Sequence, residues 1–200
     1  MKKSKKQSWE YSDTKVNPGT SDCTWEGWFY PYDNTHNGLI FDTENAGTAG
    51  IYFFYSGYNS WYLAGSDSLA IQTTRLGTTS HHWTHFAITK SGSTYELFLN
   101  GKSAGTDTGP SNITGSGLSM GCRYNSNQLD AIGNVADFHV TKEVKYTADF
   151  TPPTRAVAHS AGNTLMRFAG DLIMYDASGS MTLHSQSQGA GPNISTTTRK

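Results

Sequence analysis

Three histidines that lie close together, His81, His82 and His85, are the first candidates for chemistry, because imidazole is a common metal ligand. They stand at the start of a segment with alternating apolar residues, which predicts a β-strand. On a strand, His82 and His85 face opposite sides, and His81 and His85 share a side but stand roughly 13 Å apart at ~3.3 Å per residue. Neither pair can chelate one ion, so we expect His85 to pack or hydrogen-bond within the sheet.

The carboxylates do not form a catalytic pair either. Hydrolysis of a glycosidic bond needs two carboxyl groups that flank the bond, which on a strand requires acidic residues on one face. Glu26, Glu96 and Glu143 are isolated, and we expect each to be a solvent-facing strand or loop residue. No Ser/His/Asp constellation and no phosphate-binding Gly-rich loop is evident in the sequence. The sequence therefore favours a protein that is not an enzyme.

Aromatic residues are dense in one segment, at Tyr52, Tyr55, Tyr58, Trp61 and Tyr62. Because aromatic rings stack on the apolar faces of sugars, Tyr55, Tyr58, Trp61 and Tyr62 are candidate contacts for a glycan or for a protein interface. Tyr58 and Trp61 flank a Gly-containing turn, which would expose them. In the alternative interpretation, which we favour, Phe53, Trp61 and Leu63 fill the interior while the tyrosines line an edge or an interface.

The elements that position these residues are predicted to be short strands. The best defined is a hairpin from His82 to Gly101, in which Phe86 and Ile88 share one face, a Ser-Gly-Ser turn follows, and the return strand stops at a turn dipeptide, Asn-Gly. Further strands are predicted at residues 23–30, 38–42, 51–55, 61–63, 69–73, 118–123 and 133–141, and a polar loop at 102–117. Such short, evenly spaced strands predict an all-β protein, an antiparallel β-sandwich.

Composition limits the class of protein. Two hundred residues suit one domain, and 21 glycines with 16% charged residues favour a turn-rich β protein. The net charge of −1 argues against a nucleic-acid-binding face, and no apolar segment is long enough to span a membrane. Because the start has no hydrophobic run that suits a signal peptide, we expect synthesis in a cytoplasm, with Cys23 and Cys122 as buried free thiols.

The segment from Asp130 to Pro153, DAIGNVADFHVTKEVKYTADFTPP, carries the most specific pattern. It resembles the closing motif of laminin-G-like, concanavalin A-type jelly-roll domains in the virion proteins of tailed phages. The hairpin and the Cys23–Trp28 strand resemble the central hairpin and an early strand of the same family. Since the prolines cannot donate to a strand ladder, they lead the chain off the sheet, and we expect Tyr146 and Phe150 to pin this exit loop onto the sandwich.

The resemblance also raises the question of calcium, which some members of the family bind near a ligand-binding rim. Here Asp33, Asp42, Asp67 and Asp107 lie in or beside predicted loops, but no spacing pairs them convincingly. We therefore expect no cofactor, with calcium as the lesser alternative. Asp137 matches a family position, where it is expected to order the closing strand.

Both ends of the chain are predicted to extend from the sandwich. We divide the chain into an N-terminal arm (1–20), a jelly-roll core (21–158), strands that complete a sandwich (159–185) and a C-terminal arm (186–200) rich in Gly, Ser, Thr and Gln. Residues 163–185 resemble the opening strands of such a domain, and they complete either their own sandwich or the sheet edge of a neighbouring subunit. The lysines near the start are either a solvated tail or an arm that docks on an acidic neighbour. Assembly contacts are accordingly assigned to Lys2, Lys3, Lys5, Lys6, Trp9, Leu165 and Phe168.

The resemblance implies a function without catalysis. The first hypothesis is a non-enzymatic phage virion structural protein, a capsid decoration or cement protein that binds the major capsid protein or other virion proteins as a homo-oligomer. The alternative is a carbohydrate-binding module of a tail fibre or appendage that recognises host surface glycans. The expected location is the virion, after synthesis in the host cytoplasm.

Overall fold

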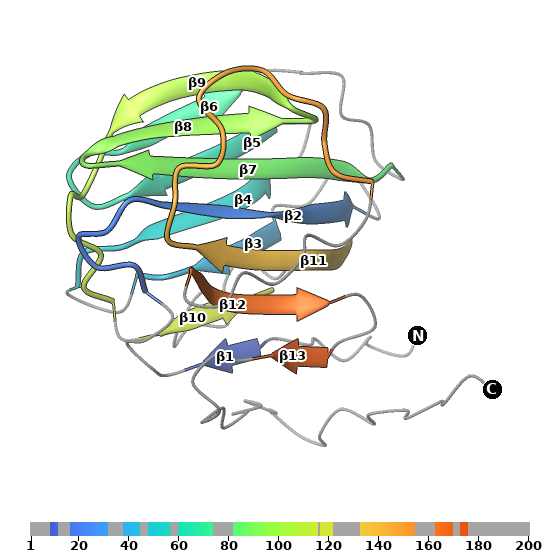
Figure 1. Cartoon of the computed structure of the whole chain (residues 1–200), viewed down its shortest axis with the longest axis horizontal. Coiled ribbons are helices and arrows are strands. Elements are labelled where there is room, and N and C mark those ends of the chain that lie inside the picture. The colour runs from blue at the N-terminus through green and yellow to red at the C-terminus, as the bar shows by residue number, and fades with distance from the viewer. Residues whose placement is uncertain are drawn as a thin grey trace.

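A computed structural model shows that the chain is a sandwich of two antiparallel β-sheets, as predicted (Figure 1). It describes residues 9–11, 17–31, 38–44, 48–56, 60–73, 82–115, 117–121, 133–154, 163–169 and 173–175. Among these residues, a six-stranded sheet has the order β1 (Trp9–Tyr11), β10 (Leu118–Met120), β3 (Gly38–Asp42), β4 (Ile51–Ser56), β5 (Ser60–Gly65) and β6 (Ala70–Thr73). A seven-stranded sheet has the order β13 (Ile173–Tyr175), β12 (Thr164–Ala169), β11 (Gly133–Thr141), β2 (Cys23–Pro31), β7 (Thr84–Ser91), β8 (Thr94–Leu99) and β9 (Lys102–Thr108). The described residues form no helix, and so none that is long and apolar enough to cross a membrane.

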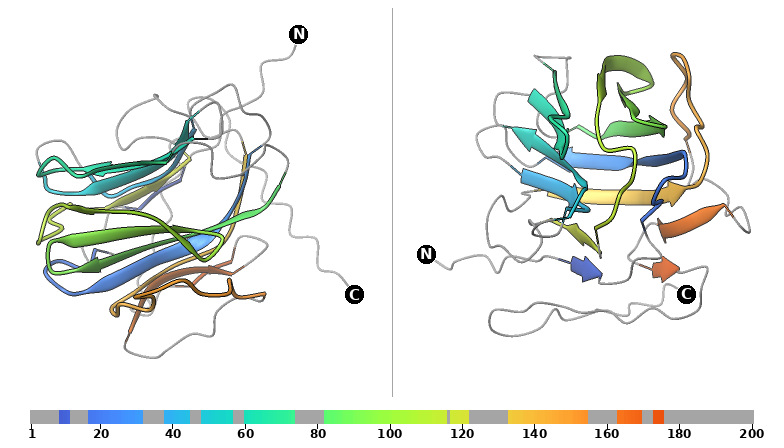
Figure 2. Two further views of the ribbon diagram at one scale, coloured as in Figure 1. Left: turned by 90° about the horizontal axis from the view of Figure 1, so that it is seen from above. Right: turned by 90° about the vertical axis from the view of Figure 1, so that its left-hand side faces the viewer.

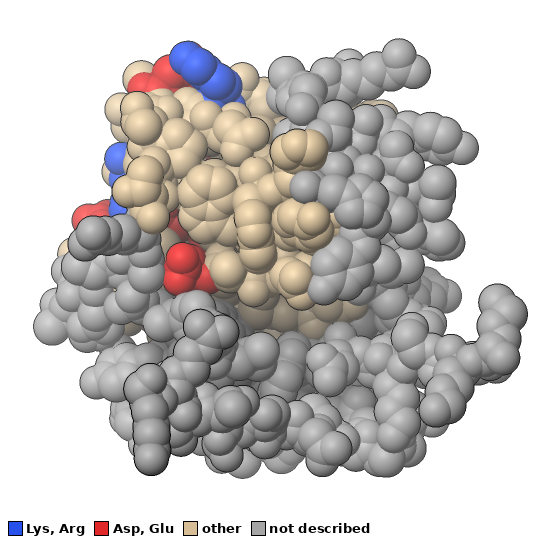
Figure 3. All heavy atoms as spheres, turned by 90° about the vertical axis from the view of Figure 1, so that its right-hand side faces the viewer, with Lys and Arg blue, Asp and Glu red and all other residues tan. Residues whose placement is uncertain are grey.

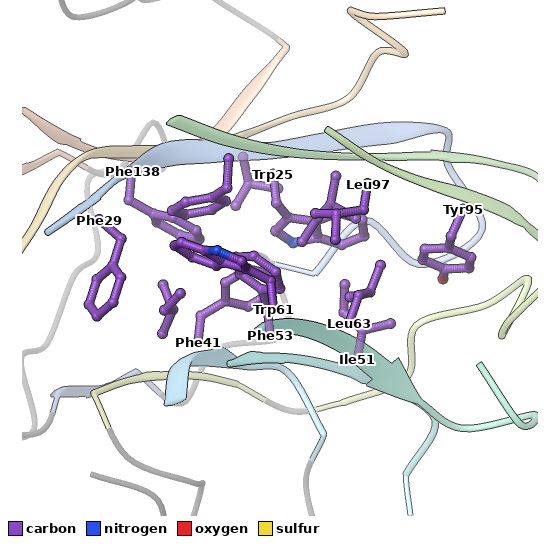
Figure 4. Packing of buried hydrophobic residues seen from close by; sticks show 14 of the residues in the cluster. Trp25, Phe29, Phe41, Ile51, Phe53, Trp61, Leu63, Tyr95, Leu97 and Phe138 are labelled. Atoms are coloured by element: carbon purple, nitrogen blue, oxygen red, sulfur yellow. The ribbon is translucent and has the colours of Figure 1, made fainter. Parts of the chain in front are cut away.

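The core lies between the two sheets, which pack face to face (Figures 2 and 4). Aromatic rings dominate it: Trp25 of β2 stacks on Phe41 of β3 across the sandwich at a centroid distance of 6.4 Å. Within the six-stranded sheet, Phe53 stacks on Trp61 at 5.6 Å. Phe53, Trp61 and Leu63 are all fully buried, so the interpretation that they fill the interior is confirmed.

The predicted hairpin is formed by β7 and β8, which pair Phe86 with Leu99. Asn100 and Gly101 both have positive φ, 48° and 74°, and turn the chain directly into β9. The prediction of a polar loop is therefore wrong for Lys102–Thr108. β9 is an edge strand that pairs only with β8 in the described sheet. Since an edge strand needs no continuous apolar face, the sequence of β9 lacks the apolar–polar alternation by which a strand is recognised.

The predicted N-terminal arm is partly built into the sandwich, which corrects the boundary at residue 20. Trp9 is in β1, where it pairs with Met120 of β10. Further along, Ile113 donates its backbone N–H to the Gly19 carbonyl oxygen at 3.0 Å. Trp9 is thus a strand residue of its own sheet rather than a residue of a free arm. The other residues assigned to this arm, Lys2, Lys3, Lys5 and Lys6, lie outside the described residues.

The predicted C-terminal strands join the seven-stranded sheet of their own chain. Val140 of β11 pairs with Met166 of β12, and Phe168 pairs with Met174 of β13. Met166 is buried in the core, and Leu165 packs against it. Leu165 and Phe168 are therefore strand residues of their own sandwich in this structure, while residues 186–200 lie outside the described part of the chain.

After β11 the chain crosses the outer face of the seven-stranded sheet, and we call residues 142–154 the exit loop (orange coil in Figure 1). The rings of Tyr146 and Phe150 stack on each other, and Phe150 packs edge-on against Phe98 of β8 at 5.5 Å and against His85 of β7 at 5.8 Å. Phe150 also donates its backbone N–H to the Gly101 carbonyl at 2.8 Å. These contacts confirm that Tyr146 and Phe150 pin the exit loop onto the sandwich.

The close approach of the exit loop to Gly101 predicts the effect of an added methyl group. A Cβ at Gly101 would lie 1.9 Å from the Phe150 carbonyl oxygen, on a backbone with φ 74°. Gly101→Ala should therefore lower the free energy of unfolding by about 3 kcal/mol or more, measured by urea denaturation. Gly92→Ala is the matched control, because Gly92 has φ 59° with nothing within 4 Å, and only the backbone cost of about 1 kcal/mol is expected. Equal losses in the two variants would show that the exit loop does not constrain Gly101.

Candidate functional site

The outer face of the seven-stranded sheet carries both polar and aromatic side chains. The core-facing residues of β2 alternate with Glu26, Trp28 and Tyr30, which point outward. Cross-strand pairing places Glu26 opposite His139 of β11, and Trp28 opposite His85 of β7. The exit loop supplies two further side chains, those of Lys145 and Tyr146, that contact Glu26.

Glu26 is fully buried at the centre of a polar group that we call the Glu26 cluster, formed with His85, His139, Lys145 and Tyr146. His139 Nε2 lies 2.7 Å from Oε1, and the Tyr146 hydroxyl donates to Oε2 at 2.7 Å. His85 Nε2 lies 3.5 Å from Oε2, and Lys145 Nζ donates to Oε1. The expectation that Glu26 faces solvent is wrong, because the exit loop brings Lys145 and Tyr146 over it.

The cluster fixes the charge on Glu26. Burial alone would raise the pKa of this carboxyl, but the hydrogen bonds from His139, His85 and Lys145 outweigh burial and hold the pKa of Glu26 well below its usual range. Burial, together with the hydrogen bond to Glu26, raises the pKa of the Tyr146 phenol, so Tyr146 stays a donor. A general acid must carry a proton and a nucleophile must reach its substrate. Glu26 is ionised and both of its oxygens are contacted, so it fits neither catalytic role. Its role is to anchor the exit loop.

Beyond the exit loop, three aromatic residues form a surface that we call the rim patch: Trp28, Tyr30 and Trp83. The rings of Tyr30 and Trp83 lie 5.4 Å apart at an angle of 57°, and Trp28 packs edge-on against His85 at 5.1 Å. Trp83 is 44% exposed, which makes it the exposed large hydrophobic residue of the described chain. Figure 3 shows the end of the sandwich where β2 ends and β7 begins, and much of its described surface carries no charged side chain.

The rim patch has the properties of a shallow sugar-binding surface. Two rings at an angle offer aromatic faces for the C–H groups of a pyranose, and a tyrosine hydroxyl or a tryptophan N–H supplies a polar tip. His85 packs against Trp28 but is itself buried, so the polar tips available to a ligand are those of the aromatic residues. The arrangement suits binding by stacking.

Sequence reasoning selected other aromatic residues as glycan or interface contacts. Tyr55 and Trp61 are buried because β4 and β5 direct them into the core, so a direct surface contact by either residue is wrong. Tyr62 is partly buried on the outer face of the six-stranded sheet, and Tyr58 lies outside the described residues. Trp83 was missed as a candidate, although its place on the face of the hairpin strand opposite the core was a usable signal.

The carboxylates considered for calcium have other roles or lie elsewhere. Asp42 is buried, Asp67 is exposed in a turn, and Asp107 accepts two backbone N–H groups, which lowers its pKa. Asp33 and His81 lie outside the described residues. Within the described part of the chain, no group of three or more His, Cys, Asp or Glu residues could hold a metal ion.

The remaining reactive candidates lie away from the rim patch. Cys23 is a buried free thiol, as predicted, and burial raises its pKa. Cys122 lies outside the described residues. Glu96 accepts a hydrogen bond from the Ser103 hydroxyl at 2.6 Å, and Glu143 is exposed in the exit loop, as predicted.

Comparison with known families agrees with this architecture. Residues 4–149 match the laminin G-type model described as the concanavalin A-like lectin/glucanases superfamily. The chain belongs to this superfamily. A search of curated protein sequences gives no significant match. Because the description of the superfamily names both lectins and glucanases, membership alone does not distinguish binding from catalysis.

Solved structures share the superfamily fold at low sequence identity. A protein of Bacteroides ovatus described as carbohydrate-binding has a TM-score of 0.67 at 13% identity, over 93% of this chain and 60% of its own. The heptameric SAP-like pentraxin of Limulus polyphemus has a TM-score of 0.59 at 14% identity, over 92% of this chain and 91% of its own. The CBM40 of the Ruminococcus gnavus IT-sialidase, bound to α2,3-sialyllactose, has a TM-score of 0.57 at 12% identity, over 74% of this chain and 91% of its own. At these identities the likeness shows the fold alone.

The charge on Glu26 predicts a pH-dependent stability. The folded-state pKa of Glu26 lies below its ordinary value of 4.5, so Glu26 contributes stability that is fully present above about pH 4.5 and is lost as the pH falls below it. Glu26→Gln should lower the free energy of unfolding at neutral pH by about 2–4 kcal/mol. Because Gln does not ionise, its difference from the native chain should shrink between about pH 4.5 and pH 2.

Urea denaturation at a series of pH values measures this difference. Glu96→Gln is the control, because Glu96 belongs to the same sheet but bonds Ser103 at the surface, and a change within about 0.5 kcal/mol is expected. A difference between Glu26→Gln and the native chain that stays constant with pH would show that Glu26 does not titrate on unfolding.

Proposed function

We propose that this domain binds carbohydrate without catalysis, through the rim patch. The observation that carries the proposal is the exposure of Trp83, which packs at an angle against Tyr30 beside Trp28. An exposed tryptophan held by a neighbouring ring is a rigid surface for a ligand, because little side-chain freedom remains to be lost on binding.

Two structures of the same fold support a carbohydrate ligand: one is described as carbohydrate-binding, and the other contains sialyllactose. The superfamily also includes glucanases by its description, and the Glu26 cluster supports binding over catalysis in this chain. His139, Lys145 and Tyr146 enclose Glu26. Its carboxylate, which is the nearest to the rim patch along β2, is therefore occupied by contacts that hold the exit loop.

The chemistry of the patch favours a neutral sugar. Trp28, Tyr30 and Trp83 carry no charge, and an anionic sugar would need a cation beside the aromatic rings. A neutral pyranose with an apolar face can stack on Trp83 while its hydroxyl groups bond the polar tips of the patch. The ligand class is therefore a terminal or internal neutral hexose.

The test is a glycan array followed by calorimetry with the best neutral glycan. Trp83→Ala should weaken binding at least about tenfold, or ~1.4 kcal/mol, because it removes the exposed ring. Trp83→Phe retains a ring and should lose less affinity. Thr106→Ala, at an exposed position of β9, is the control and should bind like the native chain. Absence of any glycan binding, or undiminished binding by Trp83→Ala, would overturn the proposal.

A second candidate is a structural role in a phage virion, as a capsid decoration protein or as part of an appendage. It is favoured by the resemblance of the closing motif to that of tailed-phage virion proteins. Of the residues of this motif, Phe138 joins the core, and Tyr146 and Phe150 hold the exit loop. In this role the partners are the major capsid protein or other virion proteins. Mass spectrometry of purified particles should then detect the chain, and its absence from particles would exclude this role while leaving glycan binding open to the array.

A further inference from the structure

The rim patch continues across the sheet to a polar residue, Asn134 of β11. The strand pairing places Asn134 directly opposite Tyr30 of β2, and the ring of Tyr30 contacts that of Trp83. Val135, the next residue of β11, packs against the core, so strand alternation directs Asn134 to the outer face, which is the face of the rim patch. Asn134 is exposed, and we call Asn134, Tyr30 and Trp83 the rim row.

The rim row crosses three neighbouring parts of the sheet: β11, β2 and the residue just before β7 (Figure 1). Adjacent strands lie about 4.8 Å apart, so two strand spacings, about 10 Å, separate the backbone at Asn134 from the backbone at Trp83. A single hexose ring is shorter than this distance, whereas two linked hexoses cover it. The length of the row therefore suits a disaccharide or a longer sugar chain.

A small residue beside Asn134 keeps the approach to the aromatic rings open. Ala136 shares the outer face with Asn134, two residues along β11, and is directly opposite Trp28. Its side chain is a single methyl group, which cannot cover the partly exposed ring of Trp28. Among the described residues, β12 pairs with β11 only from His139 to Thr141. No described strand therefore pairs with β11 at Asn134 on the side away from β2.

The side chain of Asn134 supplies hydrogen bonds that aromatic faces do not. Stacking uses the C–H groups on one face of a pyranose, whereas the hydroxyl groups around the ring are distinguished by hydrogen bonds. A primary amide has two N–H donors and an oxygen that can accept twice, so Asn134 can bond neighbouring hydroxyl groups of a sugar and keep a contact within the protein. The amide is uncharged, which agrees with the neutral ligand proposed for the rim patch.

We infer that Asn134 forms a second sugar subsite, and that the ligand of this domain is a chain of at least two neutral hexoses that lies across the rim row. One hexose stacks on Trp83 and Tyr30, and the next bonds the Asn134 amide through its hydroxyl groups. The inference rests on the proposed glycan binding, and it adds the length of the ligand and the residue that determines specificity for the second unit.

The test compares the affinity for a monosaccharide with the affinity for a disaccharide that contains it. The probes are the methyl glycosides of glucose, galactose and mannose, and the disaccharides cellobiose, maltose, lactose and α1,2-mannobiose, each titrated by calorimetry. The native chain should bind the best disaccharide at least about tenfold more tightly than the better of its monosaccharide units, since the second unit adds hydrogen bonds.

The variant Asn134→Ala should lose this gain and little else. The ratio of the two affinities should fall to about threefold or less, because the hydrogen bonds to the second hexose are removed. Its affinity for the monosaccharide should stay within about twofold of that of the native chain, since Trp83 and Tyr30 are unchanged. In Trp83→Ala, by contrast, the affinities for the monosaccharide and for the disaccharide should both be reduced.

The controls separate loss of the subsite from loss of the fold. Asn112→Ala removes another exposed asparagine, in the loop after β9 and outside the rim row, and should retain the full gain. Thermal unfolding of Asn134→Ala should be native-like. If it is not, Asn134→Leu replaces it, because leucine retains the size of the side chain without its amide.

Equal affinities of the native chain for monosaccharides and disaccharides, or a gain that persists without the Asn134 amide, would overturn the inference. So would a failure of every disaccharide of the panel to bind. These outcomes leave the proposed function to its own test, in which the array shows whether any glycan binds and Trp83→Ala shows whether the rim patch binds it.

Discussion

The buried carboxylate of Glu26 is the interaction on which the outer face of the seven-stranded sheet depends. Its partners come from three separate parts of the chain: His85 from β7, His139 from β11, and Lys145 and Tyr146 from the exit loop. An ionised carboxylate without partners is unstable in a protein interior. His139 and His85 contact its two oxygens from the sheet itself, and the exit loop adds Lys145 on Oε1 and Tyr146 on Oε2. The loop therefore completes the set of partners that stabilises the charge on Glu26 in the folded state.

His85, a member of the Glu26 cluster, connects this cluster to the rim patch. Its Nε2 approaches Glu26, one edge of its ring meets Phe150 of the exit loop, and its ring also packs against Trp28 of the patch. The orientation of Trp28 is therefore coupled through packing to the same cluster that holds the exit loop. A loss of the loop would remove a neighbour of His85 and leave the base of the patch less constrained.

The parts of this fold that local patterns determine were predictable, and the parts that depend on distant contacts were not. The β7–β8 hairpin follows from alternation and from the Asn100–Gly101 turn, and the pinning role of Phe150 follows from the closing motif. The burial of Glu26 arises from contacts with residues 113 to 120 positions away, which no local pattern records. Trp61 shows the converse: a tryptophan beside a turn is a plausible surface residue until the register of β5 directs it inward.

The exit loop is held by an ionic cluster as well as by apolar packing, and there is a physical reason for the ionic part. Apolar contacts such as those of Phe150 with Phe98 and Tyr146 stabilise the loop but are non-directional. Replacing a buried ionic group by apolar residues is often neutral or stabilising, so stability alone does not explain Glu26. The two carboxylate oxygens accept from donors at fixed positions, and they therefore define where Tyr146 lies and, through its stacking, where Phe150 lies. We interpret Glu26 as the residue that sets the register of the loop, and with it the boundary between the covered sheet and the exposed rim patch.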